Sequence, residues 1–148
     1  KYFDSFMFSL RSKNSSDPTP MSGIIRKILK NRQGNRTSLY GLISDQTPAR
    51  AEIRFRTDFL SQDTPVFLGA EKIAAKYDMA VVFMNIQKIR RGYYCITTEL
   101  LFEHTAELPE HFITETHVKR LEEIIREKPE HWLWTHRRWK YKREDANG

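Results

Sequence analysis

The order of the apolar segments predicts an α/β protein in which a layered sheet is flanked by helices. Along the 148 residues, amphipathic helical patterns alternate with short β-rich runs in the order helix, strand, helix, strand, strand, helix. Nine Phe, six Tyr and three Trp, with 39% hydrophobic residues, indicate a packed core rather than disorder. A chain of this length forms one domain or a portion of a larger one.

Two helices are predicted in the first part of the chain. Apolar side chains at helical spacing indicate a short helix over residues 2–10, which a polar loop follows. A second helix is expected over residues 21–33, because Pro20 suits its first turn and Gly34 can end it in a left-handed conformation. Its apolar positions follow helical spacing: Met21, Ile24, Ile25, Ile28 and Leu29.

The middle of the chain predicts a buried strand, an edge segment and a third helix. Residues 39–43 form a nearly continuous apolar run, which is typical of a strand buried on both faces. Apolar and basic residues alternate over 53–56, which favours a brief edge strand or an extended loop. A helix is expected over about 65–77, with Pro65 in its first turn.

The remaining elements are two strands and a last helix. β-Branched and aromatic residues predict strands over 79–86 and 93–98, joined by a basic turn over 88–91. Cys95 alternates within the second of these strands and has no acid-base neighbour, so we expect a buried structural thiol. The final helix, around residues 118–125, ends before Pro129.

Composition excludes several classes of protein. No run reaches the roughly 18 to 20 apolar residues that would span a bilayer, and no signal-peptide pattern opens the chain. The single cysteine and five scattered histidines form no metal-binding spacing, so we expect neither a metal nor a cofactor. The net charge of +6 favours anionic partners, which include nucleic acid, lipid headgroups, phosphorylated substrates and an acidic carrier protein.

A polar segment at the end of the first predicted strand is the strongest candidate site. Asp45 and Gln46 place a carboxylate and an amide there, and Thr47 adds a hydroxyl. Ligands of open α/β sheets gather outside the carboxyl ends of strands, which favours a binding role. The alternative is a simple turn before Pro48.

Three segments together carry a resemblance to a known family. They are the Asp-Gln-Thr-Pro sequence at 45–48, the stretch over residues 58–74 and the Trp-rich ending over residues 128–140. In this order they resemble the C-terminal half of the bacterial lipid A biosynthesis acyltransferases, which are the lauroyl/myristoyl or late acyltransferases. Their sequences are most similar to those of Bacteroidetes-type members. The resemblance implies a glycerolipid-acyltransferase-like fold, of which residues 1–148 would be a single C-terminal portion.

The resemblance also implies a reaction and a place in the cell. The parent protein would transfer a fatty acyl group from an acyl carrier protein or CoA thioester to a hydroxyl of a lipid A precursor or related lipid. This would occur at the cytoplasmic face of the bacterial inner membrane. The family's catalytic HX4D/E dyad would precede Lys1, so we expect no catalytic residue in this chain, which would be a soluble fragment, inactive by itself.

The implied partners are acyl carrier protein or acyl-CoA, a phosphorylated lipid acceptor and an anionic membrane surface, rather than nucleic acid. Arg11 resembles the arginine that follows the family's catalytic block and would engage phosphate or the developing oxyanion. Asp45 and Gln46 would lie on the acceptor or oxyanion side of the site. Arg137 and Arg138 complete the expected substrate-binding residues.

One pair in the chain has the spacing of the catalytic dyad without its expected position. His117 and Glu122 match HX4E, but they fall within the last predicted helix. Side chains five residues apart on a helix are rotated by roughly 140 degrees, so they would point apart. We therefore expect a solvated helix face rather than a catalytic pair.

The tryptophans of the C-terminal segment leave several roles open. Trp132, Trp134 and Trp139, interleaved with basic residues, could stack bases, lie at a membrane interface or pack against the sheet. If the segment is helical, Trp132 and Trp139 share a face, which favours packing with a basic, lipid-facing rim. The alternative function is a basic module that binds nucleic acid or an acidic partner without catalysis.

Overall fold

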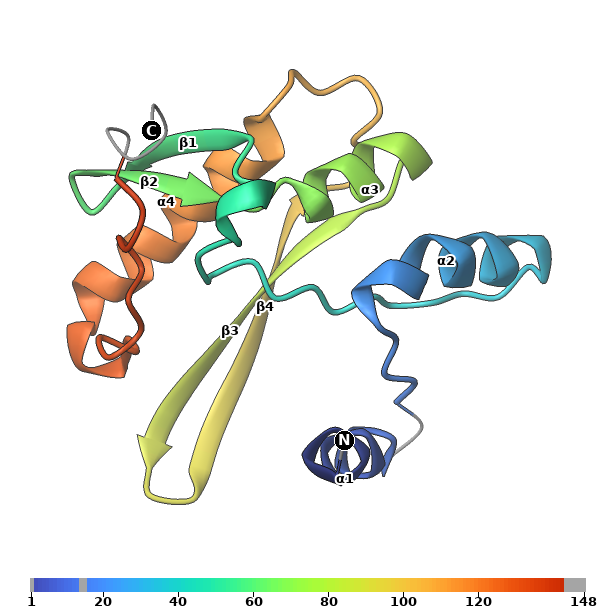
Figure 1. The fold of residues 1–148 in the computed structure, drawn as a ribbon, viewed down its shortest axis with the longest axis horizontal. Coiled ribbons are helices and arrows are strands. Elements are labelled where there is room, and N and C mark those ends of the chain that lie inside the picture. Colours follow the sequence, from blue (N-terminus) through green and yellow to red (C-terminus); the bar gives the residue numbers. More distant parts are fainter. Residues whose placement is uncertain (1, 14–15, 143–148) are drawn as a thin grey trace. The chain divides into compact units, whose positions relative to one another are not determined.

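The computed structural model describes residues 2–13 and 16–142, and the chain divides into two compact units (Figure 1). Unit 1 ends at Gly41, and unit 2 begins at Leu42. The described elements are a mixture of helices and strands, in agreement with the predicted α/β class. Within the described ranges, no helix is both long and apolar enough to cross a membrane.

Unit 1 contains the two predicted helices. They are α1 (Tyr2–Arg11) and α2 (Ile24–Gln33), and a 3-10 turn over Met21–Gly23 leads into the second. No side chain of α1 is buried, whereas Ile28 of α2 is fully buried.

The end of α2 differs in one detail from the prediction. The Gly34 N–H donates to the Lys30 carbonyl at 3.1 Å, as a helix-ending residue does. The left-handed conformation lies one residue later, at Asn35, where φ is 50°. Asparagine adopts this conformation more readily than most residues, so it can take the place expected of glycine.

Unit 2 contains the strands. In chain order its main elements are β1 (Phe55–Phe59), β2 (Gln62–Val66), α3 (Gly69–Tyr77), β3 (Val81–Arg90), β4 (Tyr93–Phe102) and α4 (Phe112–Glu127). Single 3-10 turns lie at Arg50–Glu52 and Pro129–His131. These strands form two separate antiparallel pairs, β1 with β2 and β3 with β4.

The prediction of a buried strand over residues 39–43 is wrong. The run is irregular, and Leu39 is 93% exposed. It crosses the boundary between the two units, and no strand among the described residues pairs with it. A strand needs a partner for its backbone N–H and C=O groups, and an apolar run cannot reveal whether one exists.

The third helix begins later than predicted, at Gly69 instead of Pro65. Pro65 lies in β2, opposite Arg56 of β1, and Thr64 beside it is completely buried. A proline is tolerated here because each strand of a two-stranded sheet is an edge strand. The prediction of a brief edge strand or an extended loop over 53–56 agrees with the structure, since the Ile53 backbone is extended and β1 begins at Phe55.

The second strand pair is longer than expected. Each strand has 10 residues, and the turn between them contains only Arg91 and Gly92 instead of the predicted 88–91. Gly92 has a φ of 79°, which glycine adopts at little cost. Cys95 is exposed, so the prediction of a buried thiol is wrong, because this part of the strand has no covering element among the described residues.

The core of unit 2 lies between the β1–β2 pair and α4. Its buried side chains are Phe59, Val66, Val118 and Ile125. Trp132 and Trp139 pack against this cluster, with ring centroids 6.0 and 6.2 Å from that of Phe59. The expected packing of both tryptophans is confirmed, although the segment that carries Trp139 is irregular instead of helical.

The start of α4 is held by a buried carboxylate from α3. Glu71 accepts hydrogen bonds from the backbone N–H groups of His111 at 2.7 Å and Thr114 at 2.8 Å. These groups have no partners within the helix, and the negative charge also suits the positive helix end. Glu71 therefore fixes α3 to α4.

Candidate functional site

The polar segment at 45–48 is anchored to the C-terminal segment of the chain. The Thr47 hydroxyl donates to the Arg138 carbonyl at 2.6 Å. The Thr47 backbone N–H donates to His136 Nε2 at 3.3 Å. Thr47 and Pro48 are both buried. These contacts bring two segments of the resemblance, far apart in the sequence, to one place in unit 2.

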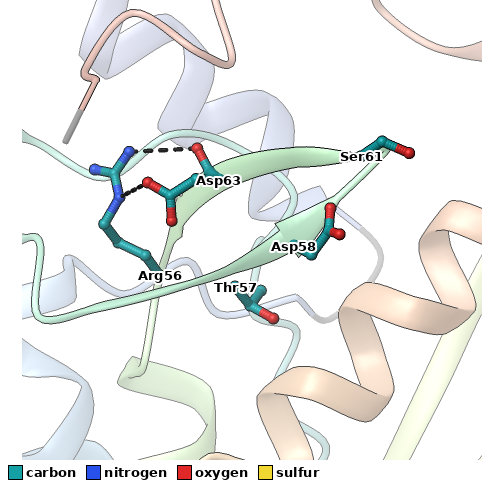
Figure 2. A pocket seen from close by; sticks show the side chains of 5 residues that line it. All are labelled: Arg56, Thr57, Asp58, Ser61 and Asp63. Atoms are coloured by element: carbon teal, nitrogen blue, oxygen red, sulfur yellow. Dashed lines mark hydrogen bonds and ion pairs between the residues drawn. The ribbon is translucent and has the colours of Figure 1, made fainter.

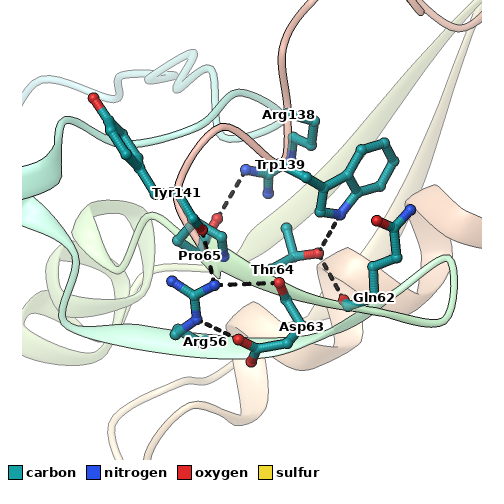
Figure 3. Close-up of polar contacts among 8 residues, drawn as sticks. All are labelled: Arg56, Gln62, Asp63, Thr64, Pro65, Arg138, Trp139 and Tyr141. Carbon is teal, nitrogen blue, oxygen red and sulfur yellow. Dashed lines mark hydrogen bonds and ion pairs between the residues drawn. The ribbon is translucent and has the colours of Figure 1, made fainter. Parts of the chain in front are cut away.

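Arg138 is the central cation of this site and is only 3% exposed. Its Nη1 donates to the Pro65 carbonyl at 2.8 Å, which joins the C-terminal segment to β2 (Figure 3). The same nitrogen lies 3.4 Å from the Thr47 hydroxyl oxygen. Burial lowers the pKa of Arg138 to about 10, and the nearby charge of Asp45 opposes this shift. The guanidinium therefore remains protonated at neutral pH.

Asp45 and Arg138 each keep one buried atom without a partner. Asp45 is half-buried, and its Oδ1 is buried with no hydrogen bond among the described residues. The same holds for Arg138 Nε. Unsatisfied buried polar atoms are costly, so they mark places where a further polar group would bind. Asp45 Oδ1 can accept a hydrogen bond and Arg138 Nε can donate one, and a hydroxyl group can be the partner of either kind of atom.

His117 on α4 faces the same region. Its ring lies 5.6 Å from that of Phe83. Burial lowers the pKa of His117, the charge of Arg138 lowers it further, and the charge of Asp45 opposes both. The expectation of a solvated helix face is therefore wrong for His117. The sequence did not indicate the burial of His117, because it depends on how α4 packs and not on the pattern of α4 itself.

The expected separation of His117 from Glu122 agrees with the structure. Glu122 accepts a hydrogen bond from the Leu60 backbone N–H at 3.0 Å and pairs with Arg126. His117 lies against Phe83 instead. The HX4E spacing therefore does not form a hydrogen-bonded dyad here.

The other predicted site residues are exposed. Gln46 adjoins the half-buried Asp45, and Arg137 adjoins the buried Arg138. The Arg137 carbonyl lies 3.5 Å from the Thr47 hydroxyl oxygen. Arg11 belongs to unit 1, where it is the last residue of α1.

A second polar region lies on the β1–β2 hairpin itself. It is a shallow pocket lined by Arg56, Thr57, Asp58, Ser61 and Asp63 (Figure 2). Arg56 pairs with Asp63 at 2.6 Å and donates to the Tyr141 carbonyl at 3.0 Å (Figure 3). The cation of this pocket therefore already joins β1, β2 and the C-terminal segment, which favours a structural role for Arg56.

Neither region resembles a metal centre. Among residues 2–13 and 16–142, no group of three His, Cys, Asp or Glu side chains is placed to hold a metal ion. The site around Arg138 instead combines a buried guanidinium, a carboxylate and a hydroxyl. This set binds polar groups by hydrogen bonds and charge.

Comparison with known proteins agrees with the resemblance of the three segments. No curated protein and no solved structure matches the chain. The profile of one family, described as bacterial lipid A biosynthesis acyltransferase, matches residues 1–141. The match covers α1 and α2 as well as the whole site around Arg138, and it extends over nearly the complete sequence. The chain therefore belongs to the bacterial lipid A biosynthesis acyltransferase family.

Proposed function

We propose that the protein containing this chain transfers a fatty acyl group from an acyl carrier protein or CoA thioester to a hydroxyl of a lipid A precursor or related lipid. Membership of the acyltransferase family supports the reaction class. The net charge of +6 suits an acidic carrier, a phosphorylated lipid and an anionic membrane. We place the reaction at the cytoplasmic face of the bacterial inner membrane.

The proposed reaction is a simple acyl exchange. The acceptor oxygen attacks the thioester carbonyl carbon, a C–O bond forms and the C–S bond breaks. The acceptor proton passes through a base to the departing thiol, so atoms and charge balance. The base belongs to the family's HX4D/E dyad, and we assign no residue of this chain to that role.

We assign substrate positioning to the site around Arg138. The single observation that carries this assignment is the pair of buried atoms without partners, Asp45 Oδ1 and Arg138 Nε. We propose that they hold a hydroxyl of the lipid, which donates to Asp45 Oδ1 or accepts from Arg138 Nε, while Gln46 and Arg137 contact its more exposed part. For Arg11, which belongs to unit 1, we propose a separate role in binding phosphate, on the family resemblance of its position.

We also propose that unit 2 belongs to a layered, glycerolipid-acyltransferase-like sheet, with residues 1–148 as its C-terminal portion. The supporting observation is the continuous family match from unit 1 through unit 2.

The test is an acyl-transfer assay on the complete protein that contains this chain. Purified protein is mixed with acyl carrier thioesters or acyl-CoA of several chain lengths and with a lipid A precursor, and mass spectrometry detects the acylated product. The double variant Gln46→Ala, Arg137→Gln should lower kcat/KM by about tenfold or more, since each lost charged hydrogen bond is worth roughly 1.5 to 3 kcal/mol. Both side chains are exposed, so folding should be preserved.

Lys72→Gln provides the matched control, because Lys72 is an exposed cation on α3. Its kcat/KM should remain within about twofold of the unchanged protein. Absence of acyl transfer with every donor would refute the proposed function. Equal losses in the double variant and the control would refute the site while leaving the reaction intact.

A further inference from the structure

The outer end of the β3–β4 hairpin combines cations with apolar side chains. This segment, residues 88–94, is named the hairpin tip. It contains Lys88, Arg90 and Arg91 together with Ile89 and two tyrosines. Between residues 79 and 98 the sequence contains no Asp or Glu. The tip is therefore a positively charged surface without local acidic compensation.

One face of the hairpin is apolar and exposed. Residues opposite each other in an antiparallel pair share a face, so the register places Ile86 with Ile96 and Lys88 with Tyr94. Large apolar side chains on this face are between 45% and 64% exposed: Val82, Met84, Ile86, Tyr94, Ile96 and Leu100. Ile89 and Tyr93 at the tip are 64% and 57% exposed.

The opposite face explains why the hairpin keeps its position in unit 2. Phe83 lies against His117, Gln87 accepts from Lys128 at 3.0 Å, and Glu99 pairs with Arg120 at 2.7 Å. All three partners belong to α4 or directly follow it. The hairpin is thus anchored through one face, and Figure 1 shows it extending away from the β1–β2 pair.

The cations of the tip are not engaged by other elements in the described part of the chain. The closest contact is internal, since the Arg90 guanidinium lies 3.7 Å from the ring centroid of Tyr93. The polar contacts described for the hairpin with α4 and its end involve Gln87 and Glu99, not residues 88–94. The tip therefore presents cations, an isoleucine and tyrosines to its surroundings.

We propose that the hairpin tip binds the surface of an anionic phospholipid bilayer and inserts Ile89 and its tyrosines into the headgroup region. Tyrosine is favoured at the membrane–water interface, and nearby Lys and Arg side chains are attracted to anionic lipids. The exposed aliphatic side chains favour a membrane over nucleic acid, whose binding surfaces use aromatic stacking. The inference deepens the proposed function, because it names the surface that would bring this enzyme to its lipid acceptor.

The first test measures binding of the 148-residue chain to vesicles by co-sedimentation. Vesicles of phosphatidylcholine with 30 mol% phosphatidylglycerol, an amount chosen as roughly that of an anionic membrane, are compared with pure phosphatidylcholine. The double variant Arg90→Gln, Arg91→Gln should weaken binding to the anionic vesicles by about 30-fold, since each cation near the surface contributes roughly fivefold. Binding should also fall steeply with added salt.

The matched control removes two exposed cations from α3, as Lys72→Gln, Lys76→Gln. Its binding should remain within about threefold of the unchanged chain, because charges farther than a Debye length from the lipid surface are screened. Circular dichroism of both variants checks that their secondary structure is intact. Equal weakening by the two double variants would overturn the assignment to the tip.

A second test measures insertion directly. Cys95 is the single cysteine of the sequence, is exposed and adjoins the tip, so it can carry an environment-sensitive fluorophore. Anionic vesicles should shift its emission to the blue, and Ile89→Ser should reduce that shift by more than half. No shift on vesicle binding would overturn the proposal.

Two further results would also contradict it. A blue shift without vesicles, accompanied by dimers in analytical ultracentrifugation, would assign the face to a second copy of the chain. Binding to single-stranded oligonucleotides that depends on Arg90 and Arg91, without vesicle binding, would assign it to nucleic acid. Neither measurement depends on acyl transfer, so the membrane proposal and the proposed reaction can fail separately.

Discussion

The two β-hairpins of unit 2 have opposite environments, although the longer one is richer in β-branched and aromatic residues. β1–β2 has strands of five residues, and Phe59, Thr64 and Val66 are buried against α4 and the C-terminal segment. β3–β4 has strands of 10 residues, and every residue from Lys88 to Leu100 is exposed. Length and β propensity therefore do not decide which hairpin contributes to the core.

The difference lies in long-range partners. The Trp139 indole N–H donates to the Thr64 hydroxyl at 2.7 Å, and that hydroxyl donates to the Gln62 carbonyl at 2.8 Å (Figure 3). The short hairpin thus has its buried polar groups satisfied from the end of the chain. The long hairpin contacts α4 and its end through the face that carries Phe83, Gln87 and Glu99, and the large apolar side chains of its other face are exposed.

The largest expected effect comes from truncating the core of the short hairpin. Phe59→Ala should lower the free energy of unfolding by about 3 to 5 kcal/mol, because Phe59 is 1% exposed and contacts two tryptophans. Ile86→Ala on the long hairpin should cost less than about 1 kcal/mol, since Ile86 is more than half exposed. Urea denaturation measures both values, and equal costs would contradict the contrast between the hairpins.

Substitutions in the two hairpin turns should have smaller and opposite effects on the free energy of unfolding. Leu60 and Ser61 have φ angles of 52° and 59°, which are strained for residues with a side chain, whereas Gly92 is relaxed at 79°. Ser61→Gly should therefore raise the free energy of unfolding by up to about 1 kcal/mol, partly offset by greater freedom of the unfolded chain. Gly92→Ala should destabilise the long hairpin by roughly 1 to 2 kcal/mol.

Native-state amide hydrogen exchange can localise these two effects. Gly92→Ala should speed exchange in β3 and β4 and leave β1 and β2 nearly unchanged, because added Cβ atoms at Gly92 would strain only its own turn. Faster exchange throughout unit 2 would instead show that the two hairpins unfold together.

The smallest expected effect is a pH dependence at the base of the long hairpin. A hydrogen bond from the Thr105 backbone N–H, and a further one with His104, lower the pKa of Asp78, while Asp78 raises the pKa of His104. The Asp78 contribution is present above its unfolded pKa, near 3.8, and is lost as pH falls through its lower folded value. The His104 contribution is present below 6.5 and is lost as pH rises through its higher folded value.

The stabilisation from this exposed pair should therefore be greatest between pH values of 3.8 and 6.5. His104→Gln should remove the stabilisation from protonated His104, which is lost as the pH rises above 6.5. The measurement is the difference in Tm between the variant and the unchanged chain at a series of pH values. A Tm difference that does not change with pH from 6 to 9, a range chosen to include the ordinary histidine pKa of about 6.5, would contradict this assignment.

Local sequence patterns predicted the segments that form the site around Arg138 but not how their side chains pack. The Asp-Gln-Thr-Pro segment and the Trp-rich ending both stood out in the sequence, and Thr47 joins them through Arg138. The position of His117 against Phe83 was not predictable, because it depends on the packing of α4. Burial of Arg138 was also hidden, since an arginine among exposed basic residues is most often solvated.

By itself the sequence determined the α/β class, the approximate positions of α1, α2, α4 and the strands of the long hairpin, and the segments that carry the family resemblance. These follow from local periodicity, turn residues and motif order, which act over a few neighbouring positions. Tertiary structure alone decided that residues 39–43 form no strand, that Pro65 lies in β2 and that Cys95 is exposed. Those outcomes depend on which distant segment supplies a backbone partner or a covering side chain, and no local pattern contains that information.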